Sequence, residues 1–587
     1  MRKTKIICTL GPATDSEAMV RGLIEAGMNV ARFNFSHGTH EEHLEKLNLV
    51  KRLRAEMGVP VATMLDTKGP EIRLRDFKNG GVILVEGAEF TLTTREVEGT
   101  QNEVSISYPK LPGDVKAGDT VLIDDGLIRL TVREVSATDI LCTVVNGGPV
   151  SNHKGVNVPG VRLSMPYVSQ ADREDILFGI RNGFDFIAAS FARTPQDILD
   201  IRNLLAEESC RHIKIIAKIE NAQGVENLDG ILAVSGGIMV ARGDLGVEVA
   251  MEDIPVLQKV MIHKCVGDGK MVITATQMLE SMIKNPLPTR AEASDVANAI
   301  YDGTSAIMLS GETAAGKYPL EAVRTMDAIA RRIEQDIDYK RRLRSRAENS
   351  YANVTDAISH ATCTTALDIG AAAIVPVTNS GRTARMVSKY RPPMPIVACT
   401  YDPHTYQQLA LSWGVTPVMV EQQTETFALF NAAMEGALRH SGFLKPGDLV
   451  VLTAGVPLGV SGTTNLLKVE TVGGALVGGG LGRELAVKGP VAVGRNTEEL
   501  LGNYHERDIV VCRKADLSIM NLLLTASGII TEERDAQSDT LLDSIAGQRN
   551  IPVIVGVHDC TRLLRTGETV AMDSGLGTVS PLKVDQN

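Results

Sequence analysis

The sequence predicts an α/β protein built on a TIM (β/α)8 barrel that carries an inserted all-β lid domain. An apolar run followed by a helical segment recurs three times before residue 70 and five times after residue 165. Between these blocks, residues 71–165 show short alternating strands separated by Gly and Asp turns, with no helical period. Three strands and five strands together make the eight of a closed barrel, with the β domain inserted after the third.

The predicted barrel strands all end in polar residues. In chain order they lie in KIICTLGP, NVARFNFSHG, VPVATMLDTKGP, FDFIAASFART, HIKIIAKIEN, GGIMVARGDLG, KMVITATQMLESM and TSAIMLSGET. Barrel active sites lie at the C-terminal ends of the strands, and the opposite loops show no matching concentration of polar residues. The sequence therefore predicts one functional mouth, formed by Arg32, Asn34, Asp66, Ser190, Lys218, Glu220, Asp244, Thr276, Ser310 and Glu312.

The pattern divides the chain into four regions. The predicted catalytic barrel covers residues 1–69 and 166–344, and the lid covers residues 70–165. A charged linker leads into residues 345–473, where helix and strand alternate as in an open α/β layer. A Gly-rich stretch, GGALVGGGLGRE, then opens a small mixed domain over residues 474–587.

Composition argues against several classes of function. The net charge of −11 over 587 residues is unfavourable for general affinity to nucleic acid or an anionic membrane. No stretch approaches the roughly 18 apolar residues of a membrane span, and the N-terminal apolar run is too short for a signal peptide. The eight cysteines are scattered singly, which indicates a reduced, cytoplasmic protein without a zinc site.

Two carboxylates end neighbouring predicted strands. Glu220 and Asp244 are 24 residues apart (244 − 220 = 24), about one strand–helix–strand unit. Two such groups repel unless a cation lies between them, and oxygen ligands with partial protein coordination favour Mg²⁺ or Mn²⁺. An isolated pair is more often an Asp that caps a helix and a solvated Glu. The polar residues at the other strand ends favour the metal here.

The predicted mouth also collects positive charge from Arg32, Arg73, Lys218 and Arg242. Cations, a divalent metal and a closing lid are what phosphoryl transfer needs, because dispersed oxyanion charge must be neutralised and kept from water. Arginine offers phosphate a bidentate fork, and lysine offers a point charge. The sequence thus predicts phosphoryl transfer, with a plain salt bridge as the alternative role of Lys218.

Two further polar sets point to ion binding. Asn34, Ser36, Asp66 and Thr67 form a low-charge group of oxygens that suits a monovalent cation better than Mg²⁺. Residues 378–384, TNSGRTA, lie between a predicted strand and a helix, where backbone N–H groups, hydroxyls and an arginine could hold a phosphate. An ordinary capped helix start is the alternative for this loop.

The motifs that carry these residues resemble the pyruvate kinase family. RFNFSHG, LDTKGPEIR, KGVNVPG, FARTPQD, KIENAQGV, MVARGDLGVE, TATQMLESM and PTRAEASDVANAIYDGTSAIMLSGETA follow the family's order through residues 1–473. The resemblance implies transfer of phosphoryl from phosphoenolpyruvate to ADP, giving pyruvate and ATP, with Mg²⁺ and K⁺ as cofactors. A metal-dependent aldolase or lyase, and a catalytically inactive metabolite sensor, are the rival hypotheses.

The resemblance also assigns roles residue by residue. Glu220 and Asp244 match the family's Mg²⁺ ligands, and Lys218 matches the lysine that stabilises the transferring phosphoryl group. Thr276 is often placed near the proton relay to the enolate. Contacts to phosphoenolpyruvate are matched by Arg32, Lys218, Gly243, Asp244 and Thr276, the K⁺ cage by Asn34, Ser36, Asp66 and Thr67, and nucleotide contacts by Asn34, His37, Arg73 and Lys154.

Regulation and assembly are implied by the resemblance as well. It implies a glycolytic homotetramer whose α/β region, residues 345–473, is allosteric. Asn379 stands where sugar-bisphosphate-responsive animal forms often carry Lys, so we expect a phosphorylated effector other than fructose 1,6-bisphosphate. The residues that match the family's effector phosphate loop are Thr378, Ser380, Arg382 and Thr383.

The tail resembles the swivelling phosphohistidine domain of phosphoenolpyruvate-utilising enzymes, through the strings GIITEE and NIPVIVGV. That domain's T-S-H motif should lie between these strings, but the chain has ERDAQSDT there and no histidine until His558. We therefore expect a structural or interface role for residues 474–587 and no phosphohistidine relay.

Overall fold

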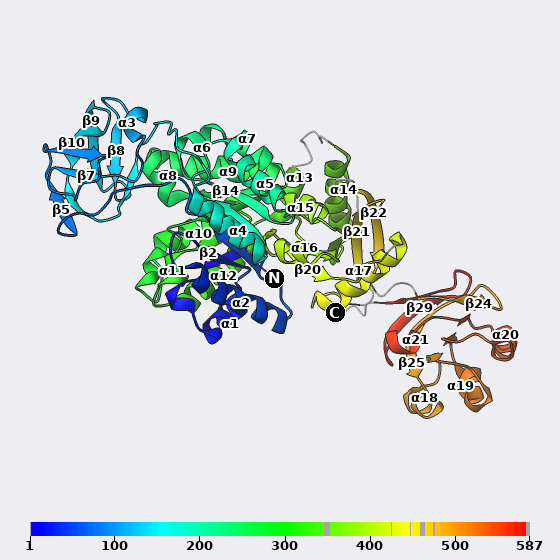
Figure 1. The fold of residues 1–587 in the computed structure, drawn as a ribbon. Helices are drawn as coiled ribbons and strands as arrows, with labels where there is room; N and C mark the ends of the chain where they lie inside the picture. The colour runs from blue at the N-terminus through cyan, green and yellow to red at the C-terminus, as the bar shows by residue number, and fades with distance from the viewer. Residues whose placement is uncertain are drawn as a thin grey trace. The chain divides into compact units, whose positions relative to one another are not determined.

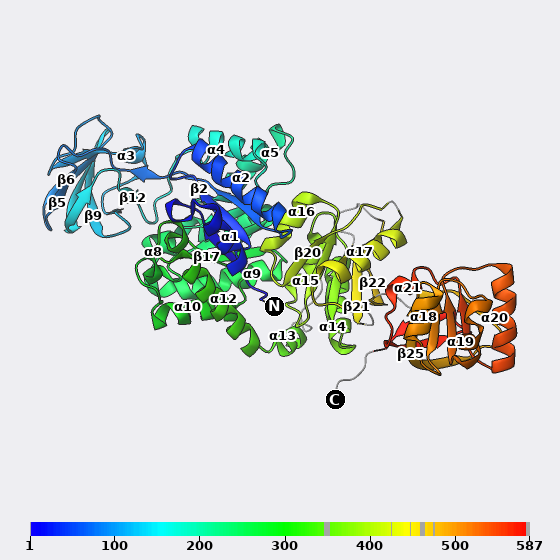
Figure 2. The same ribbon diagram turned by 90° about the horizontal axis from the view of Figure 1, so that it is seen from below.

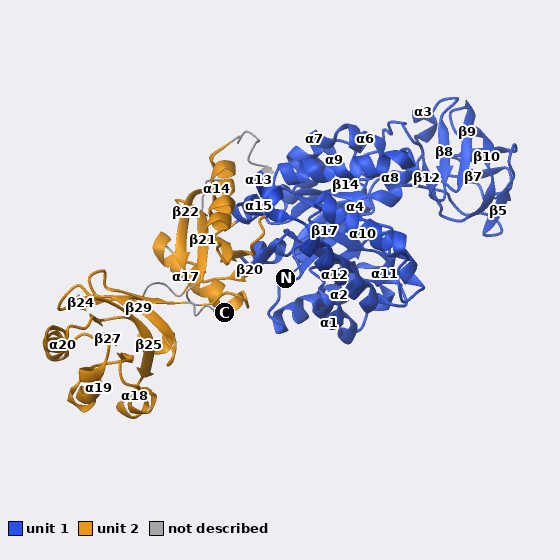
Figure 3. Cartoon of the chain, turned by 180° about the vertical axis from the view of Figure 1, so that it is seen from behind, with its two compact units in different colours: residues 1–346, 380–391, 402–417 blue, residues 347–379, 392–401, 418–587 orange. Residues whose placement is uncertain are grey.

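The computed structural model describes residues 2–345, 353–423, 425–445, 448–457, 464–472 and 476–582. The chain splits into two compact units (Figure 3). Unit 1 contains Met1–Arg346, Ser380–Arg391 and Asp402–Pro417, and unit 2 contains Ala347–Asn379, Pro392–Tyr401 and Val418–Asn587. Two short segments late in the sequence therefore belong to the same unit as the N-terminal region.

Unit 1 is built on the closed barrel of eight parallel strands that the sequence predicts (Figure 1). Around the barrel the strands follow the order β1-β17-β16-β15-β14-β13-β3-β2. Their bounds are β1 (Lys5–Thr9), β2 (Val30–Asn34), β3 (Ala62–Asp66), β13 (Phe186–Ala189), β14 (Lys214–Ile219), β15 (Gly237–Ala241), β16 (Met271–Ala275) and β17 (Ala306–Leu309).

Helices lie outside the barrel strands, and many begin at a capping residue. Thr39 and Glu42 form a reciprocal capping box at α2, which satisfies backbone N–H groups at the start of the helix. The helices of unit 1 are α1 (Glu17–Ala26), α2 (His40–Glu56), α4 (Gln170–Arg181), α5 (Pro195–Glu207), α6 (Ala222–Glu226), α7 (Leu228–Val234), α8 (Arg242–Glu248), α9 (Ile254–Gly267), α10 (Arg290–Asp302), α11 (Gly311–Ala314), α12 (Pro319–Asp336), α13 (Tyr339–Ser345), α15 (Arg382–Lys389) and α16 (Pro403–Gln408).

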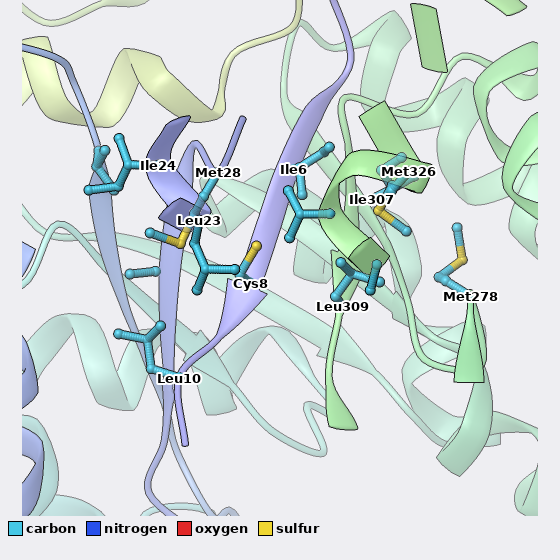
Figure 4. Packing of buried hydrophobic residues seen from close by; sticks show 14 of the residues in the cluster. Ile6, Cys8, Leu10, Leu23, Ile24, Met28, Met278, Ile307, Leu309 and Met326 are labelled. Carbon is cyan, nitrogen blue, oxygen red and sulfur yellow. The ribbon is translucent and has the colours of Figure 1, made fainter. Parts of the chain in front are cut away.

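Alternation along each strand separates two hydrophobic layers. In β1, Ile7 packs inside the barrel, whereas Ile6 and Cys8 pack outward against the surrounding helices (Figure 4). Because both faces are covered, all five residues of β1 are buried. The inner layer also includes Ala410 and Leu411, which come from the late segment Asp402–Pro417.

An all-β insertion follows β3, as the loss of helical period predicts. Its larger sheet has seven strands in the order β4-β12-β8-β9-β10-β6-β7, and β11 pairs with β5. Asp124 and Asp125 turn the chain between β8 and β9 with positive φ values of 55° and 53°. The strands are β4 (Ile72–Arg73), β5 (Gly81–Leu84), β6 (Glu89–Thr93), β7 (Glu103–Ser105), β8 (Thr120–Ile123), β9 (Ile128–Val135), β10 (Asp139–Asn146), β11 (Gly148–Ser151) and β12 (Gly155–Asn157), with the short helix α3 (Leu111–Asp114).

A five-stranded sheet in the order β20-β19-β18-β21-β22 follows the barrel. β18 pairs in parallel with β19 and β21, and β22 runs antiparallel to β21. The elements are α14 (Val354–Asp368), β18 (Ala373–Pro376), β19 (Ile396–Thr400), β20 (Val415–Met419), α17 (Thr426–His440), β21 (Leu449–Gly455) and β22 (Thr464–Thr471).

The C-terminal region is a mixed domain with a sheet of eight strands and several helices (Figure 2). Its central strands β25 to β28 are parallel, and each of the outer pairings is antiparallel. None of the helices in the described part of the chain is long and apolar enough to cross a membrane. The elements are β23 (Leu476–Val477), β24 (Gly479–Leu481), β25 (Ala486–Gly494), α18 (Thr497–Asn503), β26 (Ile509–Cys512), α19 (Met520–Thr525), β27 (Gly528–Thr531), α20 (Ala536–Arg549), β28 (Val553–Val555), α21 (Cys560–Leu563), β29 (Thr569–Asp573) and β30 (Thr578–Pro581).

Candidate active site

The barrel places the predicted polar residues at one end of its strands. Asn34 and Asp66 are register partners at the ends of β2 and β3. Lys218 lies in β14, next to Met239 of β15, and Glu220 follows β14 directly. β15 and β16 then lead into Gly243, Asp244 and Thr276.

A buried lysine is the centre of the mouth. The ammonium of Lys218 donates to Asp66 Oδ1 at 3.0 Å and to Ser190 Oγ at 2.7 Å, and it lies 3.0 Å from Glu220 Oε1. The other oxygen of Asp66 accepts a 2.6 Å hydrogen bond from Arg32 Nε. These contacts fix the positive charge of Lys218 in one position before any substrate arrives.

The charges around Asp66 and Lys218 keep both of these groups ionised. Burial acts to raise the pKa of Asp66, but the positive charges of Arg32 and Lys218 outweigh it and hold that pKa below its ordinary value. Burial acts to lower the pKa of Lys218, yet Asp66 and Glu220 raise it above the ordinary value. Lys218 is therefore a permanent cation at neutral pH, as stabilisation of a phosphoryl group requires.

Glu220 has the properties of a metal ligand. Its side chain is 1% exposed, and its Oε2 accepts a 2.6 Å hydrogen bond from the Phe191 N–H. Oε1 accepts no hydrogen bond among the described residues, although the Lys218 ammonium is close. Burial raises the pKa of Glu220 to about 7, opposed by Lys218 and reinforced by Asp244. An incompletely satisfied carboxylate beside a second one fits a divalent cation.

Glu220 and Asp244 offer only two carboxylates as metal donors. Within the described part of the chain, no group of three or more His, Cys, Asp or Glu side chains could hold a metal ion. Mg²⁺ keeps several waters and is usually bound through one or two carboxylates together with substrate oxygens. The donor set of Glu220 and Asp244 therefore fits Mg²⁺ or Mn²⁺ better than a metal that needs a closed protein cage.

Thr276 is held in a strained backbone conformation. Its φ is 65°, which is unusual for a β-branched residue, and Gln277 follows with a φ of 53°. The Thr276 hydroxyl donates to the Ala275 carbonyl at 2.6 Å and accepts from the Gly243 N–H at 2.8 Å. Gly243 and Thr276 are thereby joined into one edge of the mouth.

Arg242 supports that edge instead of facing the mouth as a free charge. Its guanidinium donates to the Thr276 carbonyl at 2.6 Å and to Asp295 at 2.7 Å. The side chain is 9% exposed. Arg242, predicted as one of four positive charges at the mouth, therefore uses these donors to position Thr276.

The residues predicted to hold K⁺ form a low-charge group. The Asn34 side-chain oxygen accepts from the Ser36 N–H at 3.2 Å. The Thr67 hydroxyl donates to the Ala188 carbonyl at 3.3 Å and accepts from the Ser190 N–H at 3.2 Å. Because Arg32 and Lys218 already balance the Asp66 charge, the remaining oxygens fit a monovalent cation better than a divalent one.

The predicted nucleotide residues fall into two groups. Asn34 and His37 line a cleft of about 1070 Å³ beside β1 and β2, which Arg32, a predicted phosphoenolpyruvate contact, also lines. Arg73 and Lys154 lie in the lid and do not line that cleft among the described residues. Arg73 makes 2.8 and 2.6 Å contacts to both oxygens of Glu71, and Lys154 pairs with Asp124 at 2.9 Å.

Between lid and barrel lies a smaller cavity that contains residues missed by sequence reasoning. Asp125 of the lid lines it together with Glu71, Asp244 and Glu248. Burial raises the pKa of Asp125, and the charge of Asp244 raises it further. Asn157 of β12 donates to Glu248 of α8 at 3.1 Å. The acidic turn DDG was the available signal for Asp125; nothing local marked Asn157.

The predicted effector loop is shared between the two units. Thr378 belongs to unit 2, where its N–H donates to the Cys399 carbonyl at 3.0 Å. Ser380, Arg382 and Thr383 belong to unit 1, at the start of α15, and the residue before that helix, Gly381, has a φ of 74°.

The fold and the mouth define a barrel enzyme suited to phosphoryl transfer. Comparison with known proteins identifies three family matches along the chain. Residues 1–323 match the barrel domain of pyruvate kinase, residues 356–470 match its alpha/beta domain, and residues 504–577 match the mobile domain of PEP-utilising enzymes. The chain belongs to the pyruvate kinase family.

Relatives with the same architecture span the whole chain. A pyruvate kinase from Geobacillus stearothermophilus is 49% identical over 581 residues, covering 98% of both chains. One from Sporosarcina psychrophila is 46% identical, covering 99% of both. The crystal structure of a pyruvate kinase from Cryptosporidium parvum superposes with a TM-score of 0.76 at 39% identity, over 80% of this chain and 96% of the other.

Proposed function

We propose that this chain transfers the phosphoryl group of phosphoenolpyruvate to ADP, giving pyruvate and ATP. The observation that carries the proposal is the Lys218 ammonium, held by Asp66 and Ser190 beside the carboxylate of Glu220. A fixed buried cation next to a metal-binding carboxylate matches the needs of a transferring phosphoryl group, whose charge is spread over its oxygens.

Each residue of the mouth has a part in this proposal. Lys218 stabilises the moving phosphoryl group, and Arg32 holds phosphate oxygens while anchored on Asp66. Thr276, fixed by Gly243 and Arg242, borders the enolate and takes part in its proton relay. Substrate contacts come from Arg32, Lys218, Gly243, Asp244 and Thr276.

Two cations complete the proposed site. Glu220 and Asp244 would hold Mg²⁺ (or Mn²⁺), and Asn34, Ser36, Asp66 and Thr67 would hold K⁺. When bound, the divalent ion would neutralise phosphate charge. The monovalent ion would balance negative charge at the mouth and would compete little for Glu220 and Asp244.

The nucleotide is proposed to enter from the cleft lined by Asn34 and His37. Arg73 and Lys154 would contact the nucleotide from the lid. Closure of the lid would then also exclude water from the phosphoryl transfer. Arg73 would have to exchange its contacts with Glu71 for phosphate oxygens.

We also propose regulation by a phosphorylated effector, bound by Thr378, Ser380, Arg382 and Thr383. Arginine, hydroxyls and the start of α15 are a set that binds phosphate.

The family resemblance supports a homotetramer. Eight buried cysteines without a disulfide support a cytoplasmic location.

A lactate-dehydrogenase-coupled assay tests the proposed reaction. Pyruvate should form from phosphoenolpyruvate only when both ADP and Mg²⁺ are present. Replacing K⁺ with a tetraalkylammonium salt should lower the rate strongly, whereas replacing chloride at constant K⁺ should not. Pyruvate release that does not depend on ADP would contradict the transfer, and a rate unaffected by K⁺ removal would contradict the monovalent site.

A further inference from the structure

Positively charged side chains gather at the end of the barrel opposite the mouth. Lys214 begins β14, and Lys270 directly precedes β16. Arg202 lies in α5. Arg382 and Arg385 lie in α15, which belongs to the same unit as the barrel. We call these five residues the basic cluster.

Close packing brings α15 against the turn that carries Lys270. Gly269, in this turn, has a φ of 66°, and a methyl group added to it would lie only 2.9 Å from Met386 Sδ and 3.9 Å from the Arg385 carbonyl oxygen. A small cavity is lined by Gly269, Lys270 and Arg385. The two parts of the basic cluster are therefore built next to each other.

Among the described residues, none of the five members of the basic cluster forms an ion pair with a carboxylate. Lys270 donates to the Leu232 carbonyl, and Arg385 donates to the Ser380 carbonyl at 3.2 Å. Asp268 and Asp402 act on Lys270 and Lys214 only through their electrostatic fields.

The members of the cluster repel one another. Burial, followed by the charges of Arg385 and Arg202, lowers the pKa of Lys214 to about 8. Burial and the charge of Arg382 lower the pKa of Arg385 to about 10. Lys214, Lys270 and Arg385 are only partly exposed, whereas Arg202 and Arg382 are exposed, so positive charge without a paired carboxylate extends here from the interior to the surface.

We propose that the basic cluster, Arg202, Lys214, Lys270, Arg382 and Arg385, binds a phosphorylated metabolite that carries at least two anionic groups. One group would lie at Arg382, shared with the effector loop, and the second at the lysines of the barrel. The inference rests on the effector loop of the proposed function and extends it onto the barrel itself. A ligand held this way would contact the strands β14 and β16 that end at the mouth.

Calorimetric titration of the full chain with inorganic pyrophosphate, in metal-free buffer, tests this site. Lys214→Gln and Lys270→Gln should each weaken binding about tenfold, as expected for loss of a charge-assisted contact. Arg32→Gln should leave binding at the cluster unchanged while removing any binding at the mouth. Arg324→Gln, an exposed arginine of α12, is the matched control for charge.

The outcomes separate this inference from the effector loop. Unchanged affinity in both lysine variants would overturn the proposal. If Ser380→Ala weakens pyrophosphate binding and the lysine variants do not, the effector loop stands and its extension to the barrel is refuted. If both classes of variant weaken binding, the extended site is supported.

Thermal unfolding gives a second readout. Because Lys214 is repelled by its neighbours, Lys214→Gln without anion should unfold at the wild-type temperature or above it. Addition of pyrophosphate should raise the midpoint of the wild-type protein and have a smaller effect on the variant. A variant that is less stable without anion and responds normally to it would show that Lys214 only supports the fold, which would overturn the proposal.

Discussion

At the scale of single residues, the mouth is organised by charges that satisfy one another before substrate binds. Asp66 accepts from Arg32 at one oxygen and from Lys218 at the other. Its carboxylate is 1% exposed, so water does not screen these contacts. The energetic cost of orienting the two cations is therefore met during folding and not during the reaction.

Lys218→Met should lower kcat by about 10²–10³-fold, because it removes a preorganised charge from the position where phosphoryl charge develops. The KM for phosphoenolpyruvate should change much less, since Arg32 and Gly243 remain. Steady-state kinetics in the coupled assay provide the measurement, with Lys284→Met as a control at an exposed lysine. A variant with near wild-type turnover would show that the role assigned to Lys218 is wrong.

Arg242→Lys should lower kcat about tenfold with little change in KM, because lysine cannot hold the Thr276 carbonyl and Asp295 at the same time. Asp295→Asn, which retains a hydrogen-bond acceptor, should have a smaller effect. A rise in KM without a fall in kcat would mean that Arg242 binds substrate directly.

The sequence was informative about residue types at strand ends but not about how they share their contacts. Lys218, Glu220 and Asp244 could be selected because strand ends are recognisable from apolar runs. The positive φ of Thr276 and the engagement of Arg242 depend on Ala275, Gln277 and Asp295, whose roles exist only after the loops have packed.

At the scale of elements, several side-chain contacts join the lid to the barrel and its helices. The Asn157–Glu248 hydrogen bond joins β12 to α8, the helix that carries Gly243 and Asp244. Lid position and mouth geometry are thereby connected through one short helix.

Asn157→Ala should raise the KM for ADP severalfold, because an apolar side chain cannot donate to Glu248 and the lid loses a contact that holds it over the mouth. Affinity for phosphoenolpyruvate should change less. Kinetics at saturating phosphoenolpyruvate with varied ADP measure the effect, and Asn102→Ala, at an exposed residue of the lid, is the control. Equal effects of the two substitutions would contradict the connection.

Besides Lys218 in β14, the barrel has a buried lysine in β1, Lys5, which should make the free energy of unfolding depend on pH. Lys5 donates to the Val415 carbonyl at 2.7 Å, and burial, together with Arg2, lowers its pKa from 10.5 to about 7. Between these values the unfolded chain holds a proton that the folded protein lacks, so stability should rise with pH from about 7 towards 10.5.

Lys5→Met should flatten that dependence. The unfolding midpoint of the wild-type protein should rise more between pH 7 and about 9.5 than that of the variant. Differential scanning calorimetry at several pH values measures both slopes, with Lys284→Met expected to behave as wild type. If the unfolding midpoints of the wild-type protein and of Lys5→Met changed equally with pH, the pKa of Lys5 would not be lowered by folding.

Helices and strands with strong local patterns of apolar residues could be predicted from the sequence. The elements against which they pack could not. The eight barrel strands and the β insertion follow from periods of apolar residues, which are local properties. The assignment of α15 to the barrel's unit depends on packing such as that between Gly269 and Met386, which are more than a hundred residues apart. No local signal in the sequence reports such contacts.

At the scale of the whole molecule, the C-terminal region adds a domain without adding an evident catalytic group. The family match to the mobile domain of PEP-utilising enzymes covers residues 504–577. The motif position that should contain histidine lies at the start of α20, where Asp535 caps the helix and Arg534 pairs with Asp539 at 3.1 Å.

Incubation with phosphoenolpyruvate labelled in its phosphate should therefore leave no acid-labile label on the protein. His558 is the histidine closest to the expected motif in sequence, and it is exposed beside Asp559. His558→Ala should leave turnover unchanged. Label retained by the wild-type chain and lost in this variant would show that a phosphohistidine relay exists after all.

The inner layer of the barrel has a consequence for synthesis of the protein. Ala410 and Leu411 pack in this layer, yet Leu411 is translated 102 residues after Leu309 of the last barrel strand (411 − 309 = 102). At about 5–20 residues per second, the ribosome needs roughly 5–20 seconds to supply them. During that interval the nascent barrel has all eight strands but an uncovered apolar interior at one end, the stage at which a chaperone that binds apolar surface would have most to recognise.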